Sequence, residues 1–416
     1  MTEPRVLVIS NTALKTTNAN GQVLLGVLSQ IPVENRASFF IQNTIPEKGT
    51  SQTAFRLTDV ERLHSYFNGK AQGTVLNPAQ ETTETKDIQT GHGKESFFRH
   101  LVRDRVWNHG KWDPSPLYHW ILEFRPTVIL FMSGRSPFMF NFVYDISLHF
   151  GLPVVIYTGE DEYWHKPKFL NLWDAILRHK LHKATKRLNQ RVRHYIVSNE
   201  KIAQLFKDTF HLPVTAIMPS TEVQPVSKIN STGSLFYGGN LKPGRYQSLK
   251  DISLALSKIA PEKMIDVYSN DIDDQIRHCL ASLKNVVLHD AVPRKELNEA
   301  RSKAFLLLHF ESFSSKIRPM IQNAFSTKIP DCLGSGIPFL VYAPKYCGFS
   351  SYLSAHPEAV AYASNLPDLN LLLKQAIFDE KYRAGLVSNS LVLAKENHDS
   401  IRNGLIQKQI LSEVKL

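Results

Sequence analysis

A positively charged helix start is the feature of this sequence best suited to bind an anion. Ser326, Thr327 and Lys328 precede an apolar stretch that opens near Ile329 and stops at Gly334. Ser326 and Thr327 can cap this helix. Free backbone N–H groups at a helix start attract anions, and Lys328 adds a positive charge beside them. The pattern favours a bound diphosphate, with an ordinary capped helix packed on the following strand as the alternative.

A glycine-rich turn, residues 237–245, follows one apolar strand and precedes a helix. Its Gly238 and Gly239 let the backbone approach a ligand closely, and Lys242 or Arg245 can pair with phosphate oxygens. The spacing matches neither the P-loop nor the dinucleotide fingerprint. The turn is therefore a second candidate phosphate site, or else a turn that carries surface cations.

Carboxylates follow two other strands. Three of them come directly after the expected strand 152–157, and these are Glu160, Asp161 and Glu162. At the end of a parallel strand, crowded like charges favour a carboxylate that acts as a general base, although a solvated acidic loop also accounts for them. Glu311 follows the expected strand 304–308 and can either hold ribose hydroxyls or pair with Arg318.

The run 173–194 is expected to be a helix with one apolar face and several basic ones. Its apolar residues recur at three- and four-residue steps, the period of a helix. The other faces carry a dense set of basic residues: Arg178, His179, Lys180, His182, Lys183, Lys186, Arg187, Arg191 and Arg193. This density suits an anionic membrane surface, with a solvated basic face as the alternative. Nucleic-acid binding is less expected, because no basic module with interleaved aromatic residues accompanies the run.

These residues are positioned by short apolar runs that alternate with helical segments, a pattern typical of parallel sheets wrapped by helices. The expected strands are 6–9, 39–41, 127–132, 152–157, 194–198 and 214–218 in the first half, and 234–237, 264–268, 286–288, 304–308, 339–342 and 359–362 in the second. The polar segment 45–99 is expected to be a long excursion, and 219–232 a linker. Two such halves imply a cleft between them, and open parallel sheets bind ligands beyond the carboxyl ends of their strands.

Bulk composition fits a globular protein of two domains. The 416 residues are 43% hydrophobic and carry a net charge of +11, which favours an anionic partner. No apolar run approaches the roughly 18 residues of a membrane span, and the N-terminus lacks a secretory pattern, so a cytoplasmic location is expected. The cysteines, Cys279, Cys332 and Cys347, are odd in number and lack metal-ligand spacing, so neither a disulfide framework nor a zinc site is expected.

Three segments together resemble the retaining GT-B glycosyltransferases of the family-four type, which includes many bacterial polysaccharide and lipid-linked sugar transferases. Residues 236–245 are similar to the family's strand, glycine turn and basic residue, with Arg245 where a lysine is common. Residues 286–297 resemble the strand and helix near the base, and residues 326–338 resemble the donor-binding helix start. The resemblance implies an α/β fold with two Rossmann-like domains facing a central cleft.

The implied domains are an acceptor-side domain at 1–220 and a domain at 221–397 that binds the nucleotide-sugar donor. A C-terminal helix at about 398–416 is expected to pack back on the first domain. Many members of the family have a glutamate where this chain has Asp331, and a second acid eight positions earlier, where Asn323 stands. The acid pair of the family is therefore incomplete here.

The resemblance also implies roles for individual residues. The implied catalytic residues are Asp161, Arg245 and Lys328. The implied donor-binding residues are Gly238, Gly239, Asn240, Glu311, Ser326, Thr327, Ile329 and Asp331. The implied acceptor-side residues are Asn20 and Gly21, in a glycine-containing loop after the first strand, and Glu160.

The implied activity is transfer of a sugar from a nucleotide diphosphate donor to a glycan or polyprenyl-linked acceptor, in polysaccharide or glycoconjugate synthesis. The leaving diphosphate would be stabilised by Arg245, Lys328 and the helix start, so neither a metal nor a cofactor is expected. Peripheral contact of the basic helix 173–194 with an anionic membrane is expected on the cytoplasmic side. A nucleotide-sugar epimerase of similar fold and a non-catalytic transferase-like binding protein stay open as alternatives.

Overall fold

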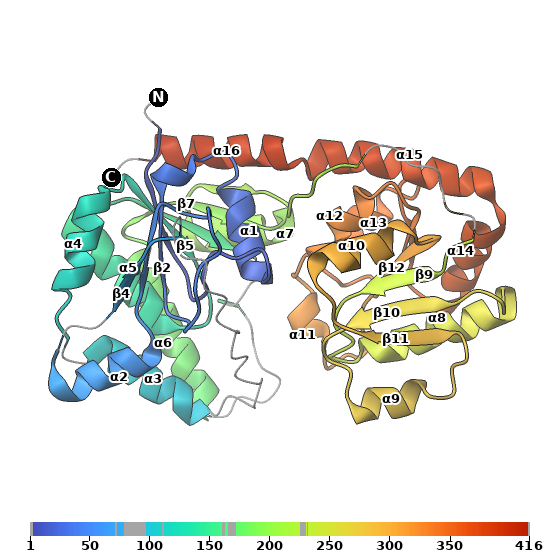
Figure 1. The fold of residues 1–416 in the computed structure, drawn as a ribbon, viewed down its shortest axis with the longest axis horizontal. Helices are drawn as coiled ribbons and strands as arrows, with labels where there is room; N and C mark the ends of the chain where they lie inside the picture. The colour runs from blue at the N-terminus through green and yellow to red at the C-terminus, as the bar shows by residue number, and fades with distance from the viewer. Residues whose placement is uncertain are drawn as a thin grey trace. The chain divides into compact units, whose positions relative to one another are not determined.

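The computed structural model divides into two compact units. It describes residues 3–70, 73–78, 97–109, 112–159, 163–164, 172–224, 230 and 232–414. Unit 1 comprises Met1–Ile217 and Ile401–Leu416, and unit 2 comprises Met218–Ser400 (Figure 1). The chain therefore passes from one unit to the other twice, after residue 217 and after residue 400.

Unit 1 is built on a sheet with eight strands within the described residues. In spatial order they are β4 (Thr74–Leu76), β3 (Thr53–Arg56), β2 (Arg36–Phe40), β1 (Val6–Ile9), β5 (Val128–Met132), β6 (Val154–Thr158), β7 (Val192–Val197) and β8 (Val214–Ala216). The β3–β4 pair is antiparallel and the other pairs are parallel. Leu7 and Ile9 join one apolar cluster while Val6 and Val8 join another, so the central strand β1 is buried on both faces.

Helices cover both faces of this sheet. They are α1 (Ala19–Val27), α2 (Asp59–Asn68), α3 (Phe97–His109), α4 (Ser115–Phe124), α5 (Pro137–Phe150), α6 (Leu172–Leu188), α7 (Glu200–Phe210) and α16 (Ser400–Glu413), with the short 3-10 helix η1 (Val33–Asn35). Helices α1 and α16 supply residues to the cluster that contains Val6 and Val8, whereas α4 to α7 supply the opposite cluster. The fold of unit 1 is therefore a three-layer α/β sandwich.

Unit 2 is built on a second sheet, which has six strands in the part of the chain that the structure describes. All of the strand pairs among these residues are parallel. In spatial order they are β11 (Val286–Asp290), β10 (Ile265–Ser269), β9 (Leu235–Gly238), β12 (Leu306–Phe310), β13 (Phe339–Tyr342) and β14 (Ala361–Ala363). The chain runs from β9 outward through β10 and β11, then returns to the other side of β9 with β12. The strand order thus reverses between β9 and β12, and ligands of open α/β sheets bind at the carboxyl ends of the strands at such a point.

The helices of unit 2 pack on both faces of its sheet. They are α8 (Arg245–Ile259), α9 (Asp274–Leu280), α10 (Arg294–Ser302), α11 (Arg318–Ile321), α12 (Lys328–Leu333), α13 (Ser350–Ser354), α14 (Leu366–Phe378) and α15 (Glu380–Asn397). Alternate residues of β9 again divide between two clusters, with Leu235 and Tyr237 on one face and Phe236 on the other.

Hydrogen bonds tie together the two segments of unit 2 that lead to unit 1. His398 Nδ1 lies 2.8 Å from the Pro219 carbonyl oxygen, and the Thr221 N–H donates to the His398 carbonyl at 2.8 Å. Thr221 also forms an isolated parallel bridge with Asp399. The first residues after one crossing are therefore fixed to the last residues before the other.

The segment 45–99, expected to be an excursion, contains β3, α2 and β4 and extends the sheet of unit 1. Periodicity missed α2 because its buried side carries Arg62 and Ser65, while Val60 and Phe67 are exposed. Arg62 lies over the ring of Trp112, with 5.0 Å from the guanidinium carbon to the ring centroid. Burial lowers the pKa of Arg62 to about 10. An inward arginine stacked on aromatic rings has no place in an apolar-stripe pattern.

The expected helix 173–194 is too long by several residues. Helix α6 ends at Leu188, a turn follows, and Val192 already belongs to strand β7. The apolar spacing continued into the strand because Val192 and Tyr195 are buried there, paired with β6 and β8 respectively. Sheet pairing, which the periodicity of one segment does not contain, decided the boundary.

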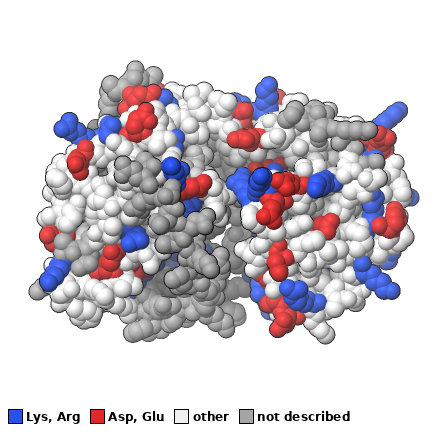
Figure 2. All heavy atoms as spheres, viewed as in Figure 1, with Lys and Arg blue, Asp and Glu red and all other residues white. Residues whose placement is uncertain are grey.

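None of the helices among the described residues is both long and apolar enough to cross a membrane. On the face seen in Figure 2, basic and acidic side chains of the described residues are interspersed. All three cysteines are free, with Cys332 and Cys347 buried and Cys279 half-buried. Burial raises the pKa of Cys332 to about 12, which makes it an unreactive core residue.

Candidate functional site

The glycine turn after β9 is held in place by one carboxylate. Asp271, which follows β10, accepts hydrogen bonds from the Leu241 N–H and the Lys242 N–H, each at 2.8 Å. The Tyr237 hydroxyl donates to the Asn240 carbonyl at 2.7 Å. Gly244 adopts a φ of +74° as the N-cap of α8, a conformation that favours glycine. The turn therefore has a fixed shape at the carboxyl end of the central strand.

An ion pair between the buried Glu311 and the half-buried Arg245 lies beside the point where the strand order reverses. The Arg245 Nε and Nη2 atoms donate to the two carboxylate oxygens of Glu311 at 2.9 and 2.8 Å, and Nη1 donates to the Lys242 carbonyl at 2.7 Å. Burial alone lowers the pKa of Arg245, but the Glu311 carboxylate outweighs this effect and raises it. Three of five N–H groups are engaged in these bonds, so two point elsewhere.

Lys328, the first residue of α12, lies against the glycine turn. A Cβ atom built on Gly239 would lie 3.0 Å from Lys328 Nζ and would collide with its Cε atom. Burial lowers the pKa of Lys328, and the positive charge of Arg245 adds to this effect. The structure therefore brings together the two phosphate candidates that are about 90 residues apart in the sequence. The absence of a side chain at residue 239 makes room for the ammonium group.

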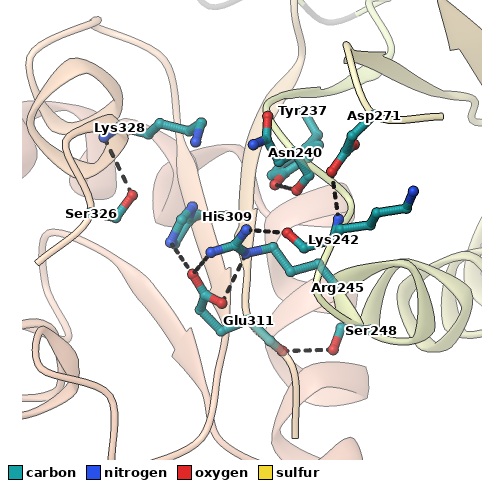
Figure 3. Close-up of polar contacts among 10 residues, drawn as sticks. All are labelled: Tyr237, Asn240, Lys242, Arg245, Ser248, Asp271, His309, Glu311, Ser326 and Lys328. Atoms are coloured by element: carbon teal, nitrogen blue, oxygen red, sulfur yellow. Dashed lines mark hydrogen bonds and ion pairs between the residues drawn. The ribbon is translucent and has the colours of Figure 1, made fainter. Parts of the chain in front are cut away.

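His309, at the end of β12, completes the cluster. Figure 3 shows its ring between Lys328 and Glu311, and its Nε2 atom lies 4.0 Å from Glu311 Oε1. The side chain is only 2% exposed. Burial, followed by the charges of Lys328 and Arg245, lowers its pKa well below the ordinary value, so the ring is neutral. The cluster of Arg245, Glu311, Lys328 and His309 is called the cation cluster below.

The expected caps of α12 are present only in part. Thr327 is its N-cap residue but makes no side-chain cap bond, and Ser326 Oγ accepts from the Lys328 N–H at a long 3.4 Å. Ile329 is fully buried in the core. The interaction that Asp331 makes is with Thr221, whose hydroxyl donates to it at 2.9 Å. Among these residues, Lys328 is therefore the one that the structure brings to the glycine turn.

The remaining donor-side residues have ordinary surroundings. The Asn240 side chain is exposed, while Gly238 packs near Phe236 and Leu297. Glu311, considered as a partner of ribose hydroxyls or of Arg318, is paired with Arg245. The Arg318 guanidinium lies over the Tyr346 ring instead, 5.0 Å from its centroid.

The acceptor-side residues lie in unit 1 or outside the described residues. Asn20 and Gly21 begin α1, where the Asn18 side chain caps the helix by accepting from the Gly21 N–H at 2.6 Å. A Cβ atom on Gly21 would collide with the Lys15 carbonyl oxygen, so close packing of the backbone requires glycine. Glu160 and Asp161 lie outside the described residues.

Two residues of the site were not singled out in the sequence. Asp271 follows β10 directly, and an aspartate just past a strand is a known partner of turn N–H groups, so its position was a usable signal. His309 belongs to an apolar strand, where a histidine is most simply a core residue. Its role depends on neighbours that are distant in sequence, and no local pattern would have identified it.

Solved structures with the same fold are known at low sequence identity. HepE from Anabaena, crystallised with UDP and glucose, aligns with a TM-score of 0.63 and 11% identity over 99% of this chain and 100% of that one. Sucrose-phosphate synthase from Thermosynechococcus elongatus aligns with a TM-score of 0.64 and 9% identity over 98% of both chains. WaaG, a glycosyltransferase involved in lipopolysaccharide biosynthesis, aligns with a TM-score of 0.55 and 12% identity over 98% and 100%.

The sequence itself matches no family model and no curated protein. The likeness to these structures extends over nearly the whole of each chain, so the expected two-domain α/β fold of the GT-B type is confirmed. At these identities the likeness concerns the fold, and function must be argued from the site.

Proposed function

We propose that this protein is a glycosyltransferase that moves a sugar from a nucleotide diphosphate donor to a glycan or lipid-linked acceptor. The observation that carries the proposal is a pair of cations at the carboxyl ends of β9 and β12. Lys328 lies against Gly239, and Arg245, paired with Glu311, is close enough to lower the pKa of Lys328 beyond the effect of burial. Two cations beside a tight glycine turn, at the reversal of a parallel sheet, suit a diphosphate. HepE, which shares the fold, has been crystallised with UDP-glucose.

The chemistry that these residues support is departure of a diphosphate. The bond between the anomeric carbon and the diphosphate oxygen breaks, the acceptor oxygen bonds to that carbon, and negative charge develops on the leaving group. Lys328 and the two remaining N–H groups of Arg245 are fixed before the reaction, so they stabilise this charge without reorganisation. We propose that these cations do the work without a metal or a cofactor.

Two finer features belong to the same proposal. We propose that the reaction retains the configuration of the anomeric carbon, and that Asp161, outside the described residues, is the base that accepts the proton of the acceptor hydroxyl. Proton NMR of the first product formed would show the anomeric configuration directly. An inverted product would refute retention, and full activity of D161N would refute the role of Asp161.

Turnover of nucleotide sugars tests the main proposal, when wild type is compared with the same substitution at two different lysines. We expect wild type to release a nucleoside diphosphate from one member of a panel of UDP-glucose, UDP-N-acetylglucosamine, GDP-mannose and ADP-glucose when an acceptor is present. Lys328→Met should lower kcat/KM by about 100-fold or more. Lys242→Met is the control, because Lys242 forms an exposed pair with Asp273 and should matter by less than about threefold.

Each outcome of this experiment has a meaning. Equal losses in the two variants, or full activity of Lys328→Met, would refute the role of the cation cluster. Conversion of labelled donor to a second nucleotide sugar without any acceptor would indicate an epimerase. Failure of wild type to bind or turn over any member of the panel would favour a non-catalytic binding protein.

We further propose a peripheral contact with an anionic membrane on the cytoplasmic side, through exposed basic residues of α6. Lys180 and Arg187 of this helix already pair with Asp104 and Asp145, so Lys183 and Lys186 are the exposed lysines that support the proposal. Each lysine near an anionic surface contributes about 1 kcal/mol.

Flotation with phosphatidylglycerol vesicles tests this contact, and phosphatidylcholine vesicles serve as the control. The double variant Lys183→Glu, Lys186→Glu should lose binding to the anionic vesicles. Binding that ignores vesicle charge would refute the contact, and a dependence of turnover on a polyprenyl-linked acceptor would support the lipid-linked substrate.

A further inference from the structure

His309 is a buried polar side chain that no described residue hydrogen-bonds. It is 2% exposed, and neither Nδ1 nor Nε2 has a partner among the described residues. Leaving a buried donor or acceptor unpaired costs about 1–3 kcal/mol. Native proteins keep few such groups, and each one needs an explanation.

A structural role does not account for this histidine. His398, in the same unit, is also buried, but its Nδ1 and Nε2 atoms are paired with the Pro219 carbonyl and the Tyr352 hydroxyl. Among the described residues, the nearest carboxylate oxygen to His309 Nε2 is 4.0 Å away, beyond hydrogen-bond distance, and that carboxylate is already engaged by Arg245. The Phe349 ring packs edge-on at 5.4 Å and provides no acceptor comparable to an oxygen.

The surroundings of His309 indicate the kind of ligand that would pair with its ring nitrogens. The ring lies beside two cations, Lys328 and Arg245, and these together with burial keep it neutral. A neutral imidazole has one N–H donor and one acceptor nitrogen. An anion that enters between the two cations brings oxygen acceptors to the buried ring, and a phosphate does so without adding a competing donor.

We propose that His309 binds the donor diphosphate directly, with its ring N–H donating to a phosphate oxygen that Lys328 and Arg245 also contact. The inference rests on the proposed function, since it takes the ligand of the cation cluster to be a nucleoside diphosphate. A third full positive charge would repel the other two whenever no anion is bound. A neutral donor orients the phosphate without this repulsion.

Calorimetry with UDP, GDP and ADP tests the inference in the full-length protein. Wild type should bind at least one of the three. His309→Phe should bind that nucleotide about 10- to 100-fold more weakly, which is the worth of a hydrogen bond to a charged group. In the absence of nucleotide, the same variant should unfold at a temperature no lower than that of wild type, because an unpaired polar group has been removed.

Matched variants separate binding from folding. His398→Phe removes a fully paired histidine and should lower the unfolding temperature while leaving the affinity unchanged. His309→Gln and His309→Asn place an amide nitrogen near Nε2 and Nδ1 respectively, and the one that restores affinity identifies the donor atom. This rescue also keeps the inference testable if His309→Phe folds poorly.

The outcomes separate a failure of the inference about His309 from a failure of the proposed function. If wild type binds a nucleotide and His309→Phe binds it equally well, the inference about His309 is wrong and the proposed function stands. If both amide variants fold but neither binds better than His309→Phe, a hydrogen bond is not what His309 provides. If wild type binds none of the three nucleotides, the proposed function fails and this inference falls with it.

Discussion

Acid should destabilise unit 2 through one buried histidine, His398. Because a carbonyl oxygen only accepts, Nδ1 carries the proton and donates to Pro219, and Nε2 accepts from the Tyr352 hydroxyl. Both nitrogens of the neutral ring therefore have hydrogen-bond partners. Protonation of Nε2 would turn this atom into a second donor facing the Tyr352 O–H. Burial lowers the pKa of His398 to about 4, although the hydrogen bond to the Pro219 carbonyl acts in the opposite direction.

The sign of the effect follows from proton uptake. A histidine in the unfolded chain has a pKa near 6.5, so below this pH the unfolded state binds a proton that the folded state does not. Stability from this group is complete above pH 6.5 and falls as the pH decreases towards 4. One pH unit is worth about 1.4 kcal/mol, so the loss is about 2 kcal/mol at pH 5 and approaches its limit of about 3.4 kcal/mol below pH 4.

Urea unfolding at pH 7 and pH 5, followed by circular dichroism, measures this loss. His398→Asn can still donate to Pro219 but does not titrate, so wild type should lose about 2 kcal/mol more than the variant between the two pH values. His309, whose pKa is also lowered, contributes equally to the acid-induced loss of stability in both proteins, so its effect cancels in the difference between them. His278→Asn, at an exposed position of α9, is the control and should behave as wild type.

The five tryptophans all lie in unit 1, so their fluorescence records the other unit in the same sample. A fluorescence transition that responds equally to pH in wild type and His398→Asn would confine the effect to unit 2. Parallel stability curves by circular dichroism for these two proteins would refute the assignment of acid sensitivity to His398.

Three further changes have defined consequences. Gly239→Ala should weaken binding of the nucleoside diphosphate that wild type takes at least about tenfold in calorimetry, because its Cβ atom displaces the ammonium group of Lys328; unchanged affinity would show that Lys328 does not contact the ligand. Glu311→Gln should lower the free energy of unfolding in urea by about 3 kcal/mol or more, because Arg245 is left without its counter-charge, and a neutral outcome would contradict this. Thr221→Val should cost about 1 kcal/mol through the lost bond to Asp331, and Thr221→Ser, which keeps the hydroxyl group, is its control.

The sequence predicted the parts of the fold in which one strand is buried on both faces. Such strands are continuous apolar runs, and residues 6–9, 127–132 and 304–308 coincide with β1, β5 and β12 to within two residues. The periodicity failed where a buried face is polar. Helix α2 turns Arg62 inward, and its start was nevertheless readable, because Thr58 and Glu61 form a capping box.

The candidate site was predictable as two separate pieces, but not as one cluster. Local chemistry identified the turn at Gly239 and the cation at Lys328, since glycines and lysines at strand ends have a short list of uses. Their contact depends on the order of β9 and β12 in the sheet, and no local sequence pattern indicates that order. The same limit explains why Arg245, which is 66 residues away, was not expected as the partner of Glu311.

The incomplete acid pair has a physical resolution in this chain. Asp331 does not leave an unpaired charge near the donor site, because the Thr221 hydroxyl binds it, and Glu311 is neutralised by Arg245. With His309 neutral, the formal charge of the cation cluster is that of Lys328 alone. A diphosphate with more than one negative charge therefore exceeds the single positive charge of the cluster. The excess negative charge is largest when the bond between the sugar and the diphosphate breaks. On this reasoning a neutral donor that points at the leaving oxygens, such as the proposed His309 N–H, should matter more to turnover than to ground-state binding.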